Sequence, residues 1–376
     1  MQNLKVKYIA EDHNVWAVHA GRYKRQYETF LENNVVFLEL PGLPSAGVDF
    51  GNLQSVRQAI RMSDGVLKWI IGQSTNPPVR NLDAYDGNPI DIAEEGARTF
   101  NSQVGNVMSL FHQAKAGDLV LVPGKGHYKS VLIGEIETSF DSDDLILLRQ
   151  YDDEATPFRR VNWLNTEIPK RNFSKYVSKR LENRHAVINL NKNWSDLNSI
   201  SDDVYKFAYQ NFIFKDQSHI TLSGPTYNSK EPQGIFDATD LIKAVYAMNT
   251  VVGSGGADFR GQNIAQIIAQ HYNGEQVTDF TFNFNSPGRI GFGSAALGAI
   301  TVLGIISVAL GGLSFEDALG GVSLEFNGEA APTEVQNECN DRMRGILNSM
   351  NQGQYDELQK KCTDARNGIG LNVERP

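Results

Sequence analysis

The chain is poor in cysteine, with only Cys339 and Cys362 among its 376 residues. Two cysteines exclude a scaffold built on disulfides and a cysteine-rich zinc site, and they fit a reducing compartment. Both lie on an apolar helical stripe, where buried thiols are expected rather than a redox pair. Residues 1–10 also lack the long apolar segment of a secretory signal. These features predict a cytoplasmic protein.

Several signatures of catalysis are also missing. The chain has no glycine-rich phosphate loop between a strand and a helix, no G-x-S-x-G nucleophile elbow and no H-E-x-x-H pair. It also lacks the nuclease spacing in which an Asp is followed on the next strand by Glu or Gln, one residue, and Lys. The seven histidines are scattered without ligand spacing. The sequence therefore predicts no catalytic residue, no metal and no cofactor.

Positive charge is scarce, because 35 Lys and Arg face 44 Asp and Glu and give a net charge of −9. A uniformly acidic surface repels phosphate, so any binding of nucleic acid has to be local. Residues 158–185 are the exception, with eight basic residues against Glu167 and Glu182 and a local charge of +6. Either this is a solvated helix face or it is a phosphate-binding patch, whose candidates are Arg22, Arg159, Arg160, Lys170, Arg171, Lys175, Lys179 and Arg180, extended by Lys24, Arg25 and Arg184.

The composition, 41% apolar and 21% charged, is that of a globular protein, and the length fits two or three domains. The first half has short apolar runs separated by turn residues, which are typical of strands. We expect strands at 15–20, 35–40, 119–123, 130–137, 145–148 and 159–164, and helices at 23–33, 53–62 and 99–113. Short strands at this spacing predict a small barrel with flanking helices.

Blocks of this half also match a known pattern in order. They are residues 16–22 (WAVHAGR), 27–36 (YETFLENNVV), 117–123 (GDLVLVP), 133–136 (IGEI) and 159–164 (RRVNWL), followed by 168–170 (IPK) and 173–174 (FS). Over residues 12–190 the chain resembles the N-terminal module of Mrr-type restriction endonucleases and related prokaryotic defence proteins. The resemblance implies a PUA/EVE-like barrel that binds a modified base, a nucleotide or nucleic acid. The chain departs from the pattern at Glu39–Leu40, where the family usually has Gly-Trp, and in about thirty extra residues at 65–95.

A module that reads a base needs flat surfaces to hold the base outside the stack. The aromatic candidates for this role are Trp16, Tyr23, Trp69, Tyr85, Tyr128 and Trp163. For Trp16 and Trp163, which lie in strands, packing in the barrel core is the alternative.

The second half begins at a polar junction after Asn191, and helices are expected at 236–252, at 261–271 and in the tail at 333–367. Its most unusual feature is residues 290–313, which are 24 residues without a charge. About twenty apolar residues span a bilayer as a helix, and the small residues in this run favour helix association. Two interpretations remain open, a membrane-spanning segment and a buried glycine-rich segment.

The sequence thus predicts an α+β protein with an N-terminal PUA/EVE-like β-barrel and a mainly helical C-terminal domain. Its predicted segments are a sensing module (1–192), a helical linking region (193–285), the apolar segment (286–332) and an amphipathic tail (333–376). The predicted function is prokaryotic antiviral defence, in which nucleic acid or nucleotide binding triggers homo-oligomerisation or disruption of the inner membrane. The alternatives are a modified-DNA restriction endonuclease with an unrecognised site, and a soluble adaptor for a partner protein.

Overall fold

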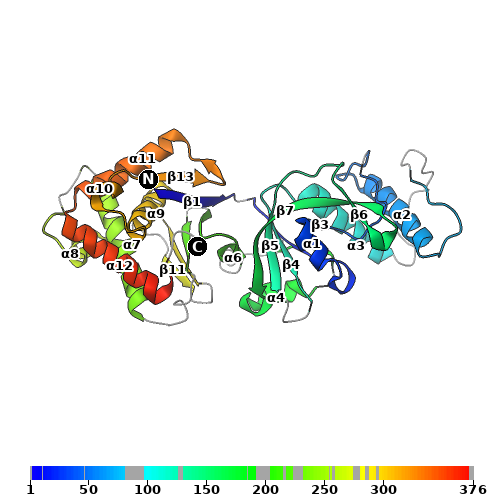
Figure 1. The fold of residues 1–376 in the computed structure, drawn as a ribbon, viewed down its shortest axis with the longest axis horizontal. Coiled ribbons are helices and arrows are strands. Elements are labelled where there is room, and N and C mark those ends of the chain that lie inside the picture. Colours follow the sequence, from blue (N-terminus) through cyan, green and yellow to red (C-terminus); the bar gives the residue numbers. More distant parts are fainter. Residues whose placement is uncertain are drawn as a thin grey trace. The chain divides into compact units, whose positions relative to one another are not determined.

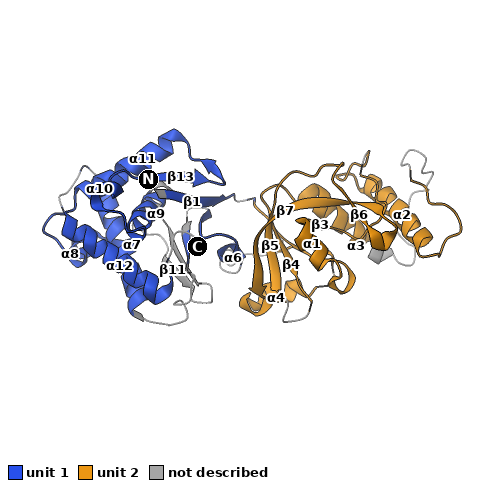
Figure 2. Ribbon diagram, in the orientation of Figure 1, with its two compact units in different colours: residues 1–12, 198–376 blue, residues 13–197 orange. Residues whose placement is uncertain are grey.

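The computed structural model describes residues 2–10, 12–45, 47–80, 97–125, 130–183, 185–191, 204–214, 217–222, 232–253, 255, 259–273, 280–283, 288–293 and 296–371. The chain divides into two compact units, coloured separately in Figure 2. Unit 1 comprises residues 1–12 and 198–376, and unit 2 comprises residues 13–197. Unit 2 is therefore inserted in the sequence after the first strand of unit 1. The predicted division differs here, because it assigned residues 1–12 to the sensing module and split the rest of unit 1 into three segments.

Unit 2 contains a curled half-barrel sheet with helices beside it (Figure 1). The strand order is β3-β7-β5-β4-β2-β8, with β6 paired to β7. All neighbouring strands are antiparallel except β2 and β4, which are parallel. The strands are β2 (Val15–Val18), β3 (Val35–Phe37), β4 (Leu119–Pro123), β5 (Ser130–Ile136), β6 (Leu145–Leu148), β7 (Glu154–Pro169) and β8 (Val187–Asn189).

The helices of unit 2 complete one apolar core with the sheet. They are α1 (Tyr27–Asn33), α2 (Leu53–Ile70), α3 (Ala97–Met108) and α4 (Lys175–Leu181), with the short turns η1 (Arg22–Lys24), η3 (Ser109–Gln113), η4 (Arg149–Tyr151) and η5 (Lys170–Asn172). All five residues of β4 are buried, as expected for a strand covered on both faces. Phe30 of α1, Val56 of α2 and Val107 of α3 join this core.

The pairing of β5 with β7 is irregular. The register between these strands shifts on both sides of Ile133, which marks a β-bulge. At Gly134 a Cβ atom would overlap the side chain of Val161 and lie 2.9 Å from the carbonyl oxygen of Asn162. Glycine is therefore required at this close approach. The expected strands and helices of the first half are present, while the finer identity as a PUA/EVE-like barrel stays a prediction.

Unit 1 combines a seven-stranded sheet with a group of helices. Within the described residues the strand order is β11-β12-β10-β9-β1-β13-β14. The strands are β1 (Gln2–Ile9), β9 (Asn211–Phe214), β10 (Gln217–Leu222), β11 (Phe280–Asn283), β12 (Gly288–Gly293), β13 (Val322–Phe326) and β14 (Glu329–Ala330). The helices are α6 (Lys206–Ala208), α7 (Pro232–Gly253), α8 (Ile264–His271), α9 (Ala296–Leu310), α10 (Phe315–Ala318), α11 (Thr333–Asn348) and α12 (Gln352–Ile369). The predicted helices are confirmed, but the sheet was not expected.

The uncharged run 290–313 does not form one helix, which favours the buried-segment interpretation over the membrane-spanning one. It is divided between β12 and α9. With 15 residues, α9 is about 22 Å long, less than the ~30 Å of a hydrocarbon core. Of the residues described, none belongs to a helix with the length and apolarity that crossing a bilayer requires.

Helix α9 is instead buried inside unit 1. Val302, Leu303 and Ile306 are fully buried in the same core as residues of α7, α11 and α12. A helix that is apolar on all sides is typical of such a central position. Gly304 allows close packing within the protein, because a Cβ there would lie 2.6 Å from the sulfur of Met343 on α11.

Both cysteines are buried free thiols of this core, as predicted. Burial raises the pKa of Cys339 to about 11, against weaker opposing effects of a hydrogen bond with Thr301 and the charge of Arg342. Burial also raises the pKa of Cys362. Both side chains are therefore protonated at neutral pH, when a thiol is a poor nucleophile.

Candidate ligand pocket and basic surface

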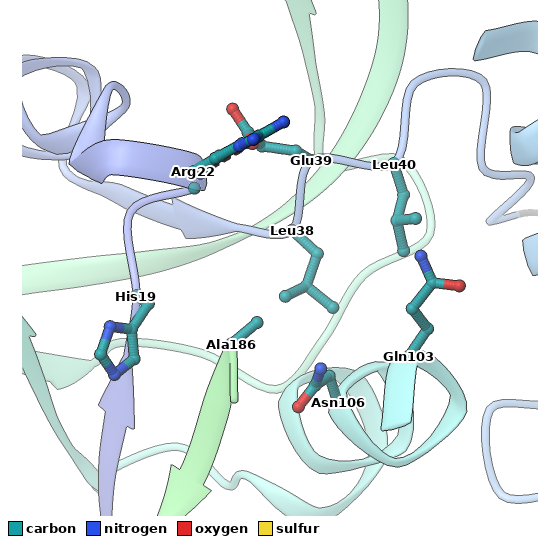
Figure 3. A pocket seen from close by; sticks show the side chains of 9 residues that line it. His19, Arg22, Leu38, Glu39, Leu40, Gln103, Asn106 and Ala186 are labelled. Atoms are coloured by element: carbon teal, nitrogen blue, oxygen red, sulfur yellow. Dashed lines mark hydrogen bonds between the residues drawn. The ribbon is translucent and has the colours of Figure 1, made fainter. Parts of the chain in front are cut away.

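A pocket of about 340 Å³ opens in unit 2 (Figure 3). It forms where four stretches of chain meet: the end of β2 with the turn into η1, the segment after β3, helix α3 and the start of β8. The volume is within the range of small-molecule sites. Its lining residues are His19, Gly21, Arg22, Leu38, Glu39, Leu40, Gln103, Asn106 and Ala186.

The pocket combines apolar walls with amide groups. Leu38, Leu40 and Ala186 supply apolar surface, and Gln103 and Asn106 project from α3 (Figure 3). The side-chain oxygen of Asn106 accepts a hydrogen bond from the backbone N–H of Val187 at 3.2 Å, which leaves its NH₂ group for a ligand. An amide offers both donors and acceptors. Such walls suit a flat heterocycle whose edge carries both donors and acceptors.

A loop held by Glu39 forms one side of the pocket. The Glu39 carboxylate accepts hydrogen bonds from the backbone N–H of Arg22 at 3.1 Å and from the side chain of Gln26 at 2.8 Å, and it pairs with the Arg25 guanidinium. Gly21 has a φ of 70°, and a Cβ there would overlap the Glu39 carboxyl group. Glu39 and Leu40, where the sequence departs from the pattern described above, thus lie in the pocket wall.

Two residues of the same loop have a strained backbone conformation. Tyr23 and Lys24 have φ values of 58° and 60°. A left-handed conformation costs a non-glycine residue on the order of 1–3 kcal/mol, and such residues cluster at functional sites. The Tyr23 ring is 74% exposed, and the Arg22 guanidinium lies over it at 5.0 Å from the ring centre.

His19 and two lysines form a positively charged group beside the pocket. The Lys24 ammonium contacts Nδ1 of His19. Because an ammonium only donates, Nδ1 accepts and the imidazole proton is assigned to Nε2, a buried atom without a partner among the described residues. Burial, and then the charges of Lys24 and Lys170, lower the pKa of His19 to about 3. Burial and the charge of Lys170 lower the pKa of Lys24 to about 8.

Lys170 connects this group to a basic surface on η5 and α4. Its ammonium also pairs with Glu182 at 3.0 Å. Arg171, Lys175 and Lys179 are exposed and form no ion pair with a residue that the structure describes. Arg180 lies over the ring of Tyr176 at 5.3 Å. We call the side chains of Lys170, Arg171, Lys175, Lys179 and Arg180 the α4 basic surface.

Two of the predicted phosphate-binding arginines have other roles. Arg159 is a correction, because its side chain is buried and donates to the carbonyl oxygens of Leu110, Ala114 and Thr138, each at 2.8 Å. Burial lowers its pKa to about 10, although Asp118 and Asp144 oppose this shift. Arg160 is exposed and forms an ion pair with Asp144 at 2.7 Å.

Of the predicted aromatic residues that the structure describes, none lines the pocket. Trp16 is a correction, because it is buried in the core and donates to the Asp118 carboxylate at 2.8 Å. Trp163 is half-buried and donates to the carbonyl oxygen of Phe30 at 3.3 Å. Trp69 lies near the end of α2, and Tyr23 follows Arg22 beside the pocket. Tyr85, Tyr128 and Arg184 lie outside the described residues.

Sequence reasoning missed most of the pocket. Only Arg22 of its lining residues was among the candidates. His19, Glu39 and Leu40 stood within or beside the matched blocks and were not assigned to a ligand. Leu38, Gln103, Asn106 and Ala186 carry no local signal, because the pocket exists only once α3 lies beside β3 and β8.

Two further cavities are less suited to the same ligand. One, of about 540 Å³, lies at α7 and α12 in unit 1 and contains the ion pair of Asp237 with Lys361 at 3.4 Å. The other, of about 520 Å³, includes Ser45, Phe50 and Phe140 of unit 2. Neither is lined by His19, on which the charge of Lys170 acts. Within the described residues, no group of three or more His, Cys, Asp or Glu is placed to hold a metal ion.

No family model, no curated protein and no solved structure matched this chain when it was compared with each.

Proposed function

We propose that unit 2 binds a nucleotide or a single-stranded nucleic acid, with one base in the pocket and the phosphate chain on the α4 basic surface. The observation that carries the proposal is the position of Lys170, which belongs to the α4 basic surface and also acts on Lys24 and His19 beside the pocket. We infer from this that the base site and the phosphate-binding surface adjoin each other. The resemblance of residues 12–190 to modules of defence proteins favours the same class of ligand.

The chemistry of the two parts is complementary. Apolar walls accept the faces of a base, and the amides of Gln103 and Asn106 can read its edge. Exposed Lys and Arg bind phosphates with release of counterions, which makes the affinity depend on salt. With a net charge of −9, this attraction has to be local, and the surface around α4 is the basic region proposed for it. The role in antiviral defence and the assembly of unit 1 stay predictions.

The test measures binding of the full chain to fluorescein-labelled single-stranded oligonucleotides by fluorescence anisotropy. The oligonucleotides carry unmodified bases, 5-methylcytosine or N6-methyladenine. The Gln103→Leu variant removes an edge-reading amide and should reduce discrimination between these bases. Gln54→Leu, an exposed glutamine on α2, is the matched control.

The basic surface is tested by its effect on salt dependence. Lys175→Glu with Lys179→Glu should weaken binding to all the oligonucleotides and lower the slope of log affinity against log salt by about 2. Lys68→Glu with Lys360→Glu makes the same change of charge on α2 and α12 and should leave the slope as in the wild type. Equal effects of both double variants would contradict the proposed surface.

A further inference from the structure

We propose that Lys24, Lys170 and His19 form a phosphate site beside the pocket, so that the ligand is a nucleotide rather than a free base or a nucleoside. This inference rests on the proposed function and assigns the position of one phosphate relative to the bound base.

The first argument is the number of free donors on the two ammonium groups. Each ammonium has three N–H groups. Lys24 uses one on Nδ1 of His19, its only partner among the described residues, and Lys170 uses one on Glu182. Four N–H groups of the two ammonium groups therefore remain. A phosphate group has oxygen acceptors enough for several of them.

The second argument is the local balance of charge. Two carboxylates lie near the group, and both are engaged: Glu39 with Arg25 and Gln26, and Glu182 with Lys170. Lys24 has no carboxylate partner among the described residues, and Lys170 is close enough to act on it electrostatically. Like charges held together in a partly buried place repel each other, and a bound anion relieves that repulsion.

The third argument is the strained backbone that places Lys24. The left-handed conformations of Tyr23 and Lys24, fixed by Glu39 through the loop, position the ammonium against His19. Strain of this kind persists where the surrounding structure enforces it, which is common at ligand sites. His19 also lines the pocket, so the phosphate site and the base pocket share one wall.

The affinity of this site for phosphate should change with pH in a range where a lysine of ordinary pKa stays protonated. Lys24, with a pKa of about 8, is protonated at pH 7 and loses its proton as the pH rises through about 8. The groups that face it are His19, which stays neutral throughout this range, and Lys170. Affinity for a phosphate-bearing ligand should therefore fall between pH 7 and pH 9.5.

The experiment compares nucleosides with their 5′- and 3′-monophosphates by calorimetry on the full chain. The set carries adenine, guanine, cytosine, thymine, 5-methylcytosine and N6-methyladenine. The monophosphate of the preferred base should bind at least about tenfold more tightly than the nucleoside, the gain expected of a charge-assisted hydrogen bond. Inorganic phosphate should compete with the monophosphate and leave nucleoside binding unchanged.

Variants of Lys24 separate this site from the base pocket. Lys24→Gln should remove the advantage of the monophosphate and leave nucleoside affinity unchanged. Lys24→Arg should keep the advantage and abolish its fall between pH 7 and pH 9.5, because a guanidinium stays charged. Lys68→Gln removes one charge from α2 and should behave like the wild type.

Two results would overturn the inference. If nucleosides and monophosphates bind equally, or if Lys24→Gln weakens both to the same extent, the phosphate site is wrong while the base pocket stands. If no member of the set binds and inorganic phosphate does not bind either, the proposed function is wrong and the inference with it.

Discussion

At the scale of single residues, the loop between β2 and α1 depends on Gly21. Its φ of 70° and the overlap that any Cβ would make with the Glu39 carboxyl both require glycine. Glu39 in turn holds Arg22, Arg25 and Gln26 in place. Gly21 and the Glu39 carboxylate therefore determine where Arg22 lies in the pocket wall. They also determine the position of Lys24 beside His19.

We predict that Gly21→Ala lowers the free energy of unfolding of unit 2 by about 1–3 kcal/mol and weakens nucleotide binding. Urea unfolding and calorimetric titration measure the two effects. Gly47→Ala is the matched control, because Gly47 has a similar φ of 78° but nothing within 4 Å of its Cβ position. If both variants lose binding to the same degree, the Glu39 contact is not what shapes the loop.

The sequence predicted some residue roles and not others, for a physical reason. The buried thiols follow from an apolar stripe, which is a local pattern. Trp16 and Arg159 look like ligand residues by type, but their partners, Asp118 and three backbone carbonyls, come from distant segments. A side chain's partner decides its role, and partners brought together by folding leave no trace in local spacing.

At the scale of elements, Arg159 joins strand β7 to the end of α3 and η3. The carbonyls of Leu110 and Ala114 lie at or after the last turn of that helix, where carbonyl groups lack intrahelical partners. The guanidinium supplies their donors and also binds the carbonyl oxygen of Thr138. Helix α3, which carries Gln103 and Asn106, is thus fixed to the sheet from its far end.

We predict that Arg159→Met lowers the free energy of unfolding of unit 2 by about 3 kcal/mol or more, because three carbonyl groups lose a buried donor. The variant should keep the wild-type salt slope of oligonucleotide binding as long as it is folded. Arg160→Met, which removes an exposed ion pair, should cost about 1 kcal/mol or less. Urea unfolding compares the two, and similar losses would contradict the structural role of Arg159.

Periodicity predicted most strands of unit 2 and the longer helices, but no strand of the unit 1 sheet, and β1 shows why. Leu4 and Val6 are buried and alternate with the exposed or half-buried Asn3, Lys5 and Lys7, which is the period of a strand. Its partners β13 and β9 lie about 300 and 200 residues further along the chain. The run 290–313 could not be assigned from its composition, because membrane helices and helices buried on all sides are equally apolar.

At the scale of the whole molecule, β1 is an inner strand of the unit 1 sheet, parallel to both β9 and β13. Unit 1 is therefore built from both ends of the sequence, with unit 2 between them. Each unit has its own apolar core.

We predict that removal of residues 1–12 unfolds unit 1 and leaves unit 2 folded, because the sheet loses an inner strand with Leu4, Val6 and Ile9. Limited proteolysis with mass spectrometry should show rapid cleavage beyond residue 204 and a resistant fragment close to residues 13–191. Removal of residues 372–376, which leaves every described element intact, is the control. Loss of both units in the truncated chain would contradict their independence.

Hydrogen–deuterium exchange of the full chain with and without the tightest-binding nucleotide tests the central claim most directly. The account predicts that the nucleotide slows exchange at residues 19–26, 38–40, 103–106 and 170–181. It predicts no change at 45–50 and 138–142, which surround the other cavity of unit 2, or at α7 and α12. Protection confined to those other regions, with none around His19 and Lys170, would contradict the account.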